Sequence, residues 1–222
     1  MLLLAIDTAT DGVAVAVRDD SGTLAARRAG DARHHNEVLV PTVEAVLAEA
    51  GRERRDVTHV VVGVGPGPYT GLRVGIVTAA TLALAWGAEL HGVCSLDALA
   101  HAAVAAGVEG EFLVATDARR REVHTARYRV GAGGAVRLAG PDVVAPAAVE
   151  RDGLVVVGRG SALHPDHLGP AREPFDVDAT ALADLAAAAL AGTGTLPLLP
   201  AEPLYLRRPD AVEPGARKRV TG

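Results

Sequence analysis

Two stretches of this chain share one pattern: Leu3-Leu4-Ala5-Ile6-Asp7-Thr8 near the start and Leu113-Val114-Ala115-Thr116-Asp117-Ala118 halfway along. A second strand-like run follows each of them, and at the same shift of 110 residues Ala126 falls on Ala16. An apolar run that ends in Asp, a turn and a second apolar run are typical of a β-hairpin. A unit that occurs twice indicates an internal repeat, which takes precedence over single elements when a fold is predicted. We therefore expect an α/β protein in which one hairpin unit is used twice.

Hydrophobic periodicity and turn residues place the remaining elements. Pro41 falls in the first turns of a predicted helix, where its missing amide proton has no helical partner. Ser95 is predicted to cap a further helix. The predicted strands are Leu2–Asp7, Val13–Arg18, Thr23–Ala29, Val57–Gly63, Leu90–Val93 and Val155–Val157, and the predicted helices span residues 38–50, 72–86, 95–107 and 180–191.

A loop rich in glycine and proline, Gly63-Val64-Gly65-Pro66-Gly67-Pro68, connects a predicted strand to the helix at Leu72–Trp86. Two phosphate-binding motifs have a related composition, and neither fits. GxGxxG needs a glycine where Pro68 stands, and GxxxxGK[ST] lacks its lysine. Two interpretations remain from these residues: a tight strand-to-helix turn, which the spacing favours, or a phosphate site.

Composition limits the classes of protein. The 222 residues suffice for one large or two small domains, and Val, Ala and Leu must fill the core because only 3% of residues are aromatic. The net charge of −5 argues against tight binding of nucleic acid by this chain alone. The single cysteine, Cys94, excludes an internal disulfide and a cysteine zinc cage. Met1-Leu2-Leu3-Leu4 lacks the basic flank of a signal peptide, and Leu82–Leu90 is too short to span a bilayer, so we expect a soluble cytoplasmic protein.

Several short motifs follow one another in a fixed order. They are Thr8-Ala9-Thr10, His34-His35-Asn36-Glu37, Gly92-Val93-Cys94-Ser95-Leu96, Asp117-Ala118-Arg119 and Ala201-Glu202-Pro203-Leu204-Tyr205-Leu206-Arg207. Together with the Gly/Pro loop, this series resembles the bacterial TsaB family over residues 1–207. The resemblance implies an actin-like (ASKHA) two-lobed α/β fold with a duplicated β-hairpin/ββαβα unit and a reduced second lobe. We expect an N-terminal lobe over residues 1–97, a smaller C-terminal lobe over 98–207 and a flexible tail over 208–222.

The resemblance also implies a function. TsaB is the non-catalytic partner of the catalytic paralogue TsaD, which acts with the ATPase TsaE to make N6-threonylcarbamoyladenosine on tRNA next to the anticodon. We therefore expect a scaffold with no catalytic residue and no cofactor that forms a heterodimer with TsaD and a homodimer when alone. It would meet tRNA only through the complex and bind no membrane. The alternative is a small ATP-dependent kinase or phosphotransferase of the actin-like class, and a metallopeptidase is the weakest interpretation because the sequence shows no metal motif.

Actin-like ATPases keep a metal-facing carboxylate at each hairpin turn, where this chain has Asp7 and Asp117. These carboxylates could hold Mg²⁺ through water in a cleft between the lobes, or each could bond amides of its own turn. The second half of the chain is short for a lobe that encloses adenosine, so we expect an incomplete nucleotide site. Its vestigial residues would be Asp7, Thr8, Thr10, Gly65, Gly67 and Asp117.

The histidines do not suggest a metal site. His34 and His35 are adjacent, and side chains one position apart diverge on a helix. TsaD carries two ligands in a His-x-x-x-His motif where this chain has Ser95 and Leu99, and His101 is out of register with that motif. We therefore expect no bound metal.

The helix after the Gly/Pro loop has a small residue at every fourth position: Gly71, Gly75, Ala79 and Ala83. Since glycine within a helix costs about 1 kcal/mol relative to alanine, this strip indicates close approach of another backbone. That backbone could belong to the chain's own sheet or to a partner. The resemblance favours the partner, because TsaB pairs with TsaD, or with itself, through its first two helices. The interface candidates are Asn36, Val40, Glu44, Gly71, Gly75, Thr78, Ala79 and Leu82.

Overall fold

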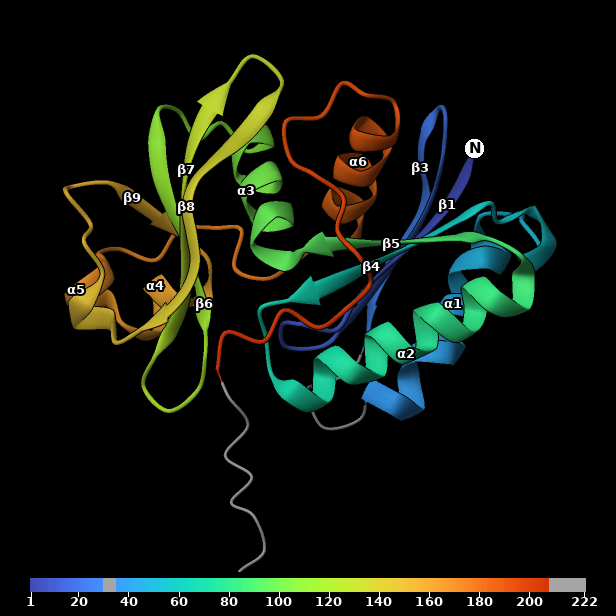
Figure 1. Ribbon diagram of the computed structural model, residues 1–222, viewed down its shortest axis with the longest axis horizontal. Coiled ribbons are helices and arrows are strands. Elements are labelled where there is room, and N and C mark those ends of the chain that lie inside the picture. The colour runs from blue at the N-terminus through green and yellow to red at the C-terminus, as the bar shows by residue number, and fades with distance from the viewer. Residues whose placement is uncertain (30–34, 208–222) are drawn as a thin grey trace, which may run out of the picture.

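The chain forms two mixed β-sheets with helices between them and on their outer faces (Figure 1). The computed structural model describes residues 1–29 and 35–207. The first sheet has the strand order β3-β2-β1-β4-β5, and the second has the order β8-β7-β6-β9. The strands are β1 (Leu2–Asp7), β2 (Val13–Asp19), β3 (Gly22–Ala29), β4 (His59–Gly65), β5 (Glu89–Cys94), β6 (Glu111–Asp117), β7 (Val123–Gly131), β8 (Gly134–Val144) and β9 (Val155–Val157). The helices are α1 (His35–Glu49), α2 (Tyr69–Trp86), α3 (Ser95–Ala105), α4 (Arg159–Leu163), α5 (Pro165–Leu168) and α6 (Ala179–Leu190), with short 3₁₀ turns at η1 (Arg54–Asp56) and η2 (Pro146–Ala148).

Both sheets are built on the same plan. In the first sheet, β1 and β2 form an antiparallel hairpin, β3 extends it beyond β2, and β4 lies parallel to β1 on the other side. In the second sheet, β6, β7, β8 and β9 repeat these relations in the same order. The first sheet carries an additional parallel strand, β5, so the second lobe is smaller. The predicted actin-like α/β fold with a duplicated hairpin unit is confirmed.

Within residues 1–29 and 35–207, three hydrophobic cores hold the layers together. α1 and α2 cover one face of the first sheet, where Leu39 and Leu72 are buried. α3 and α6 lie between the two sheets and bury Leu99 and Leu182 against strands of both (Figure 1). α4 contacts β6 and β9 of the second sheet, and Leu168 of α5 belongs to the core on the same face. Because α6 lies late in the chain and yet packs on β1 and β2, the division of the lobes at residue 97 stays a prediction.

The first strand of the repeat has a different register from the one that the sequence predicts, whereas Val13 and Val123, and likewise Ala16 and Ala126, lie on corresponding faces at the predicted shift. Ile6 of β1 faces the core under α1 and α2, and Ala115 of β6 faces the core beside α4 and α5. Since α2 and α4 each follow the parallel strand of their unit, these two faces correspond. Asp7 therefore corresponds to Thr116, and the alignment of Asp117 with Asp7 is wrong by one residue. Both strands are apolar on both faces, so their pattern does not fix the register.

Two further local predictions are wrong, although the element boundaries agree to within three residues. α1 begins at His35, so Pro41 lies in the helix interior and removes an amide that would bond within the helix. The capping position of α3 is Cys94 rather than Ser95, and the hydroxyl of Ser95 bonds to Asp7 instead. The role of Ser95 is therefore set by a tertiary contact rather than by the local helix pattern.

α2 has an unusual balance of length, hydropathy and burial. Its 18 residues have a mean hydropathy of 1.2, which by length and composition alone would allow it to cross a membrane. The sequence-based expectation concerned only Leu82–Leu90 and did not include this helix. A mostly buried core helix of a soluble protein meets the same criterion, but only 33% of α2 is buried in this chain.

Candidate functional site

The end of β1 is tied to the Gly/Pro loop and to α3 by a buried carboxylate. Asp7 Oδ1 accepts a hydrogen bond from the amide of Ala9 at 2.9 Å, and Asp7 Oδ2 accepts one from Ser95 Oγ at 2.8 Å. Ser95 Oγ in turn accepts from the amide of Gly65 at 3.2 Å. A Cβ at Gly63 would lie 1.9 Å from Asp7 Oδ2, so this position requires glycine. Asp7 is only 1% exposed, and its burial raises the pKa of the carboxyl to about 6.

The adjacent turn packs directly onto α2. Thr8 is fully buried, and its hydroxyl donates to the carbonyl of Gly71 at 2.8 Å. A Cβ at Gly75 would lie 2.2 Å from Thr8 Oγ1, and one at Gly67 would lie 2.4 Å from the carbonyl of Ala9. The glycines therefore admit the chain's own turn, which supports the structural interpretation of the Gly/Pro loop.

The small-residue strip of α2 faces inward for the same reason. Gly71, Gly75, Ala79 and Ala83 are all buried, and the two alanines belong to the core between α2 and the first sheet. Gly71, Gly75 and Ala79, which the prediction placed on a partner surface, are buried within this chain, and the group that fills the space beside Gly75 is the side chain of Thr8. The observation that something needs the space was right, but a strip at helical spacing does not say on which side of the helix the partner lies.

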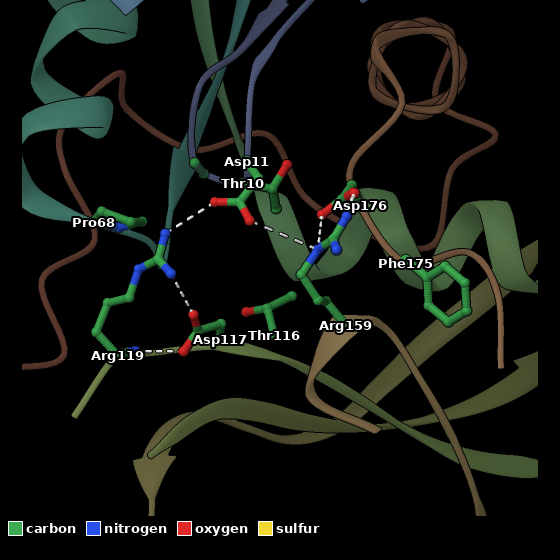
Figure 2. Close-up of a pocket in the computed structure, with 10 residues that line it drawn as sticks. Thr10, Asp11, Pro68, Thr116, Asp117, Arg119, Arg159, Phe175 and Asp176 are labelled. Carbon is green, nitrogen blue, oxygen red and sulfur yellow. Dashed lines mark hydrogen bonds and ion pairs between the residues drawn. The ribbon is translucent and has the colours of Figure 1, made fainter. Parts of the chain in front are cut away.

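A cleft between the lobes is closed by ion pairs (Figure 2). Arg119 of the second lobe bonds Asp11 of the first at 2.9 Å and Asp117 of its own hairpin at 2.8 Å. Arg159 lies 3.9 Å from the other oxygen of Asp11 and pairs closely with Asp176. The cavity among these side chains measures about 20 Å³. That volume suits a single water molecule, whereas ligand pockets measure about 300 Å³ or more.

The predicted nucleotide residues separate into two groups. Thr10 and Asp117 line the cleft, one from each lobe. Asp7 and Thr8 instead make internal hydrogen bonds, and Gly65 and Gly67 belong to the tightly packed loop beside them. The charged cleft residues that the prediction did not include are Asp11, Arg119, Arg159 and Asp176. Of these, Arg119 was visible in the sequence as part of a motif.

Arg119 extends across the cleft from a strained turn. The backbone of this turn has φ values of 60°, 55° and 60° at Arg119, Arg120 and Arg121, and residues other than glycine rarely adopt such values. The turn is closed by the amide of Arg119, which donates to Asp117 Oδ1 at 2.7 Å. Strain of this kind persists only where the surrounding contacts hold it, and here the ion pairs of Arg119 with Asp11 and Asp117 do so.

Ser95 and Leu99, the positions at which the resemblance implies metal ligands in TsaD, do not fit a metal in this chain. Ser95 donates its hydroxyl proton to Asp7, and Leu99 is fully buried in the core between the sheets. A hydroxyl that is already bonded and an aliphatic side chain offer no pair of ligands.

The outer face of α1 and α2 is the second candidate site. Val77 and Leu84 of α2 are 63% and 87% exposed, and Val40 of α1 is 43% exposed. Of the predicted interface residues, Val40 and Glu44 are exposed and Thr78 and Leu82 are half-buried, whereas the side chain of Asn36 lies outside the described part of the chain. The outward residues of α2 were missed because the inward strip gave the stronger pattern.

The last sequence motif packs at the start of this face. Tyr205 stacks on Tyr69 with ring centroids 5.1 Å apart, and its hydroxyl accepts a hydrogen bond from Arg73 Nε at 3.1 Å. The guanidinium of Arg73 also lies 4.0 Å above the ring of Tyr69. The terminal segment therefore extends the exposed surface of α2.

The duplicated sheets and the cleft between them define an actin-like protein, and known proteins share both the fold and the sequence. A family model described as "TsaD: tRNA N6-adenosine threonylcarbamoyltransferase" matches residues 29–163. The solved structure of YeaZ from Pseudomonas aeruginosa has a TM-score of 0.79 and 27% identity, and the match covers 92% of this chain and 99% of that one. TsaB of Escherichia coli, named a tRNA threonylcarbamoyladenosine biosynthesis protein, is 40% identical over 131 residues, which are 58% of this chain and 55% of that protein.

Mycobacterial relatives match along nearly the whole chain. An uncharacterized protein of Mycobacterium tuberculosis is 43% identical over 215 residues, 94% of this chain and 93% of that protein. One of Mycobacterium leprae is 44% identical, and the match spans 95% of this chain but only 56% of that longer protein. The chain belongs to the TsaB family.

Proposed function

We propose that this chain acts in the biosynthesis of threonylcarbamoyladenosine on tRNA, as a non-catalytic subunit that pairs with a TsaD protein. The observation that carries the proposal is α2, an apolar helix of which the chain buries only a third. The name of the E. coli relative and the family model supply the pathway. The helix supplies the reason to expect a protein partner.

The exposed face of α2 has the composition of an interface centre. Val77 and Leu84 lie seven residues apart and project from one side of the helix, and covering an exposed side chain of this kind contributes about 1.5–3 kcal/mol. Glu44 of α1 and Arg73 of α2 are exposed and would supply polar groups to the rim of such an interface. A second copy of the chain could cover the same face in the absence of the partner, which accounts for the predicted homodimer.

The closed cleft favours the scaffold over the kinase alternative. A phosphotransferase must hold nucleotide and acceptor between its lobes, whereas here Arg119 and Arg159 reach Asp11 across that space. A scaffold needs no opening. It acts by binding the active conformation of the catalytic subunit more tightly than the inactive one, and so shifts the population. The net charge of −5 agrees with a subunit that meets tRNA through the complex, in the cytoplasm.

Reconstitution tests this proposal. Purified TsaD, TsaE, threonylcarbamoyl-adenylate and tRNA are combined with and without this chain, and the modified adenosine is measured. We expect modification only with the chain present, and a loss of at least tenfold in TsaD affinity for Leu84→Asp. The matched control is Leu163→Asp, which changes another exposed leucine, on α4. Equal modification without the chain, or equal binding by the two variants, contradicts the scaffold, and ATP turnover by the chain alone supports the kinase.

A further inference from the structure

Three side chains with metal-binding atoms meet where β4 and β5 begin. His59 of β4 is paired with Glu89 of β5, and His91 follows Glu89 by two residues. In a strand, residues two apart face the same side of the sheet, and paired residues of neighbouring strands share a side. The ladder therefore places all three side chains on one face, at the end of the strands opposite to the cleft.

The distances are close to those around a bound ion. His91 Nε2 lies 3.5 Å and His59 Nε2 3.9 Å from Glu89 Oε2, and one ligand atom from each residue lies within 4.8 Å of the others. Ligands about 2.0–2.1 Å from a tetrahedral zinc ion are separated from one another by roughly 3.3 Å. Glu89 has a side chain that is 71% exposed, so it can rotate the remaining distance, while the ladder fixes the two backbones.

The ring of His59 is oriented for coordination by a second hydrogen bond. Its Nδ1 lies 2.8 Å from Thr58 Oγ1, and the single proton of that hydroxyl is donated to the carbonyl of Leu2 at 3.0 Å. With the hydroxyl proton used in this way, His59 donates from Nδ1. The lone pair is then on Nε2, the nitrogen that faces Glu89. Histidine ligands of metals are commonly held by such a bond from the other ring nitrogen.

His91 has an unsatisfied nitrogen at the centre of the cluster. Its Nε2 is buried and has no hydrogen-bond partner among the described residues. A buried polar atom without a partner destabilises the fold, so a bound ion that accepts its lone pair would be favoured.

We propose that His59, Glu89 and His91 bind one zinc ion through the two Nε2 atoms and the Glu89 carboxylate. Two imidazoles and a carboxylate suit zinc, whereas Ca²⁺ and Mg²⁺ prefer oxygen ligands. The exposed Glu89 leaves the fourth position open to water or to a side chain of a partner. The ion would link the edge strand β5 to β4, next to the C-terminal end of α2. This site is separate from Ser95 and Leu99, where the resemblance implies the ligands of TsaD.

Metal binding by the full chain without a histidine tag tests the site. Metal-free protein is titrated with Zn²⁺ by calorimetry, and Co²⁺ is used for the visible absorption of a four-coordinate site. We expect one ion per chain, at least tenfold weaker binding for Glu89→Gln and at least a hundredfold weaker binding for His59→Ala. Zn²⁺ should raise the melting temperature of the parent chain by several degrees and that of His59→Ala by much less.

His167→Ala is the control, because it removes an exposed histidine of α5 far from the cluster in sequence. It should bind Zn²⁺ as the parent chain does. The variants at His59 and Glu89 change side chains near the surface, so circular dichroism should show them folded, whereas the more enclosed His91 is left intact. An absence of stoichiometric binding, or binding that survives in both variants, overturns the proposal.

Discussion

Replacing Asp7 by asparagine tests whether this carboxylate serves the fold rather than a ligand. Asparagine keeps the shape of the side chain and the oxygen that accepts from Ala9, and it removes the ionisable group. In the folded chain the pKa of Asp7 is raised from 3.8 to about 6, chiefly by burial. At about 1.4 kcal/mol for each pH unit, this difference corresponds to about 3 kcal/mol between the two protonation states.

The direction of the effect follows from proton binding. Between pH 3.8 and about 6 the folded chain keeps a proton on Asp7 that the unfolded chain has released, so the contribution of Asp7 to stability falls as the pH rises. Above about pH 6 the folded chain carries a buried charge at its full cost. Relative to the parent chain, Asp7→Asn should therefore gain about 2 kcal/mol between pH 4.5 and pH 7.5.

Urea unfolding of both chains at a series of pH values measures this gain. The change with pH is the relevant quantity, since the asparagine also alters the bond to Ser95 by an amount that does not depend on pH. Asp117→Asn is the matched control, because its carboxylate is paired with Arg119 and its loss should not stabilise the chain at pH 7.5. If Asp7→Asn and the parent chain show the same dependence on pH, the reasoning about this buried carboxylate is wrong.

Two further predictions concern buried contacts. Gly75→Ala should lower the free energy of unfolding by about 1–2 kcal/mol, because overpacking against Thr8 exceeds the gain in helix propensity. Thr8→Ala should remove most of that loss in the double variant, and additive losses in denaturant unfolding would show that the clash is absent. The ring of His124 should titrate by NMR near pH 4, because burial lowers its pKa, so its contribution to stability falls from pH 6.5 towards 4. A midpoint near 6.5 would mean that the ring is accessible to water.

The hairpins could be predicted from the sequence because a local pattern determines them. An apolar run, a turn with Asp and a second apolar run specify two paired strands, and the same signal occurs twice. The correspondence between Asp7 and Thr116 could not be predicted, because both faces of β1 and β6 are apolar. Only the helices that cover those faces decide it, and their placement is a tertiary property.

For the candidate sites too, the sequence predicts local patterns, whereas the packing of distant residues decides which groups meet. The sequence revealed that α2 carries a strip of small residues, but packing alone shows that the strip faces Thr8 and the first sheet. The pairing of Asp11 with Arg119 joins residues 108 positions apart. The cluster of His59, Glu89 and His91 escaped notice because its ligands come from two neighbouring strands rather than from one helix.

The glycines of this chain connect the cleft to the proposed partner surface. At Gly63 and Gly75, the space of a missing side chain is filled by Asp7 and Thr8 from the end of β1 and the turn after it. These contacts hold the inner face of α2 against the sheet, and in doing so they determine where Val77 and Leu84 lie on the outer face. In an actin-like enzyme the same turn would face a nucleotide. Here it packs against α2, so the rigid turn and the exposed apolar face belong to one arrangement. Under the proposed function, that arrangement positions the surface that a TsaD protein would bind.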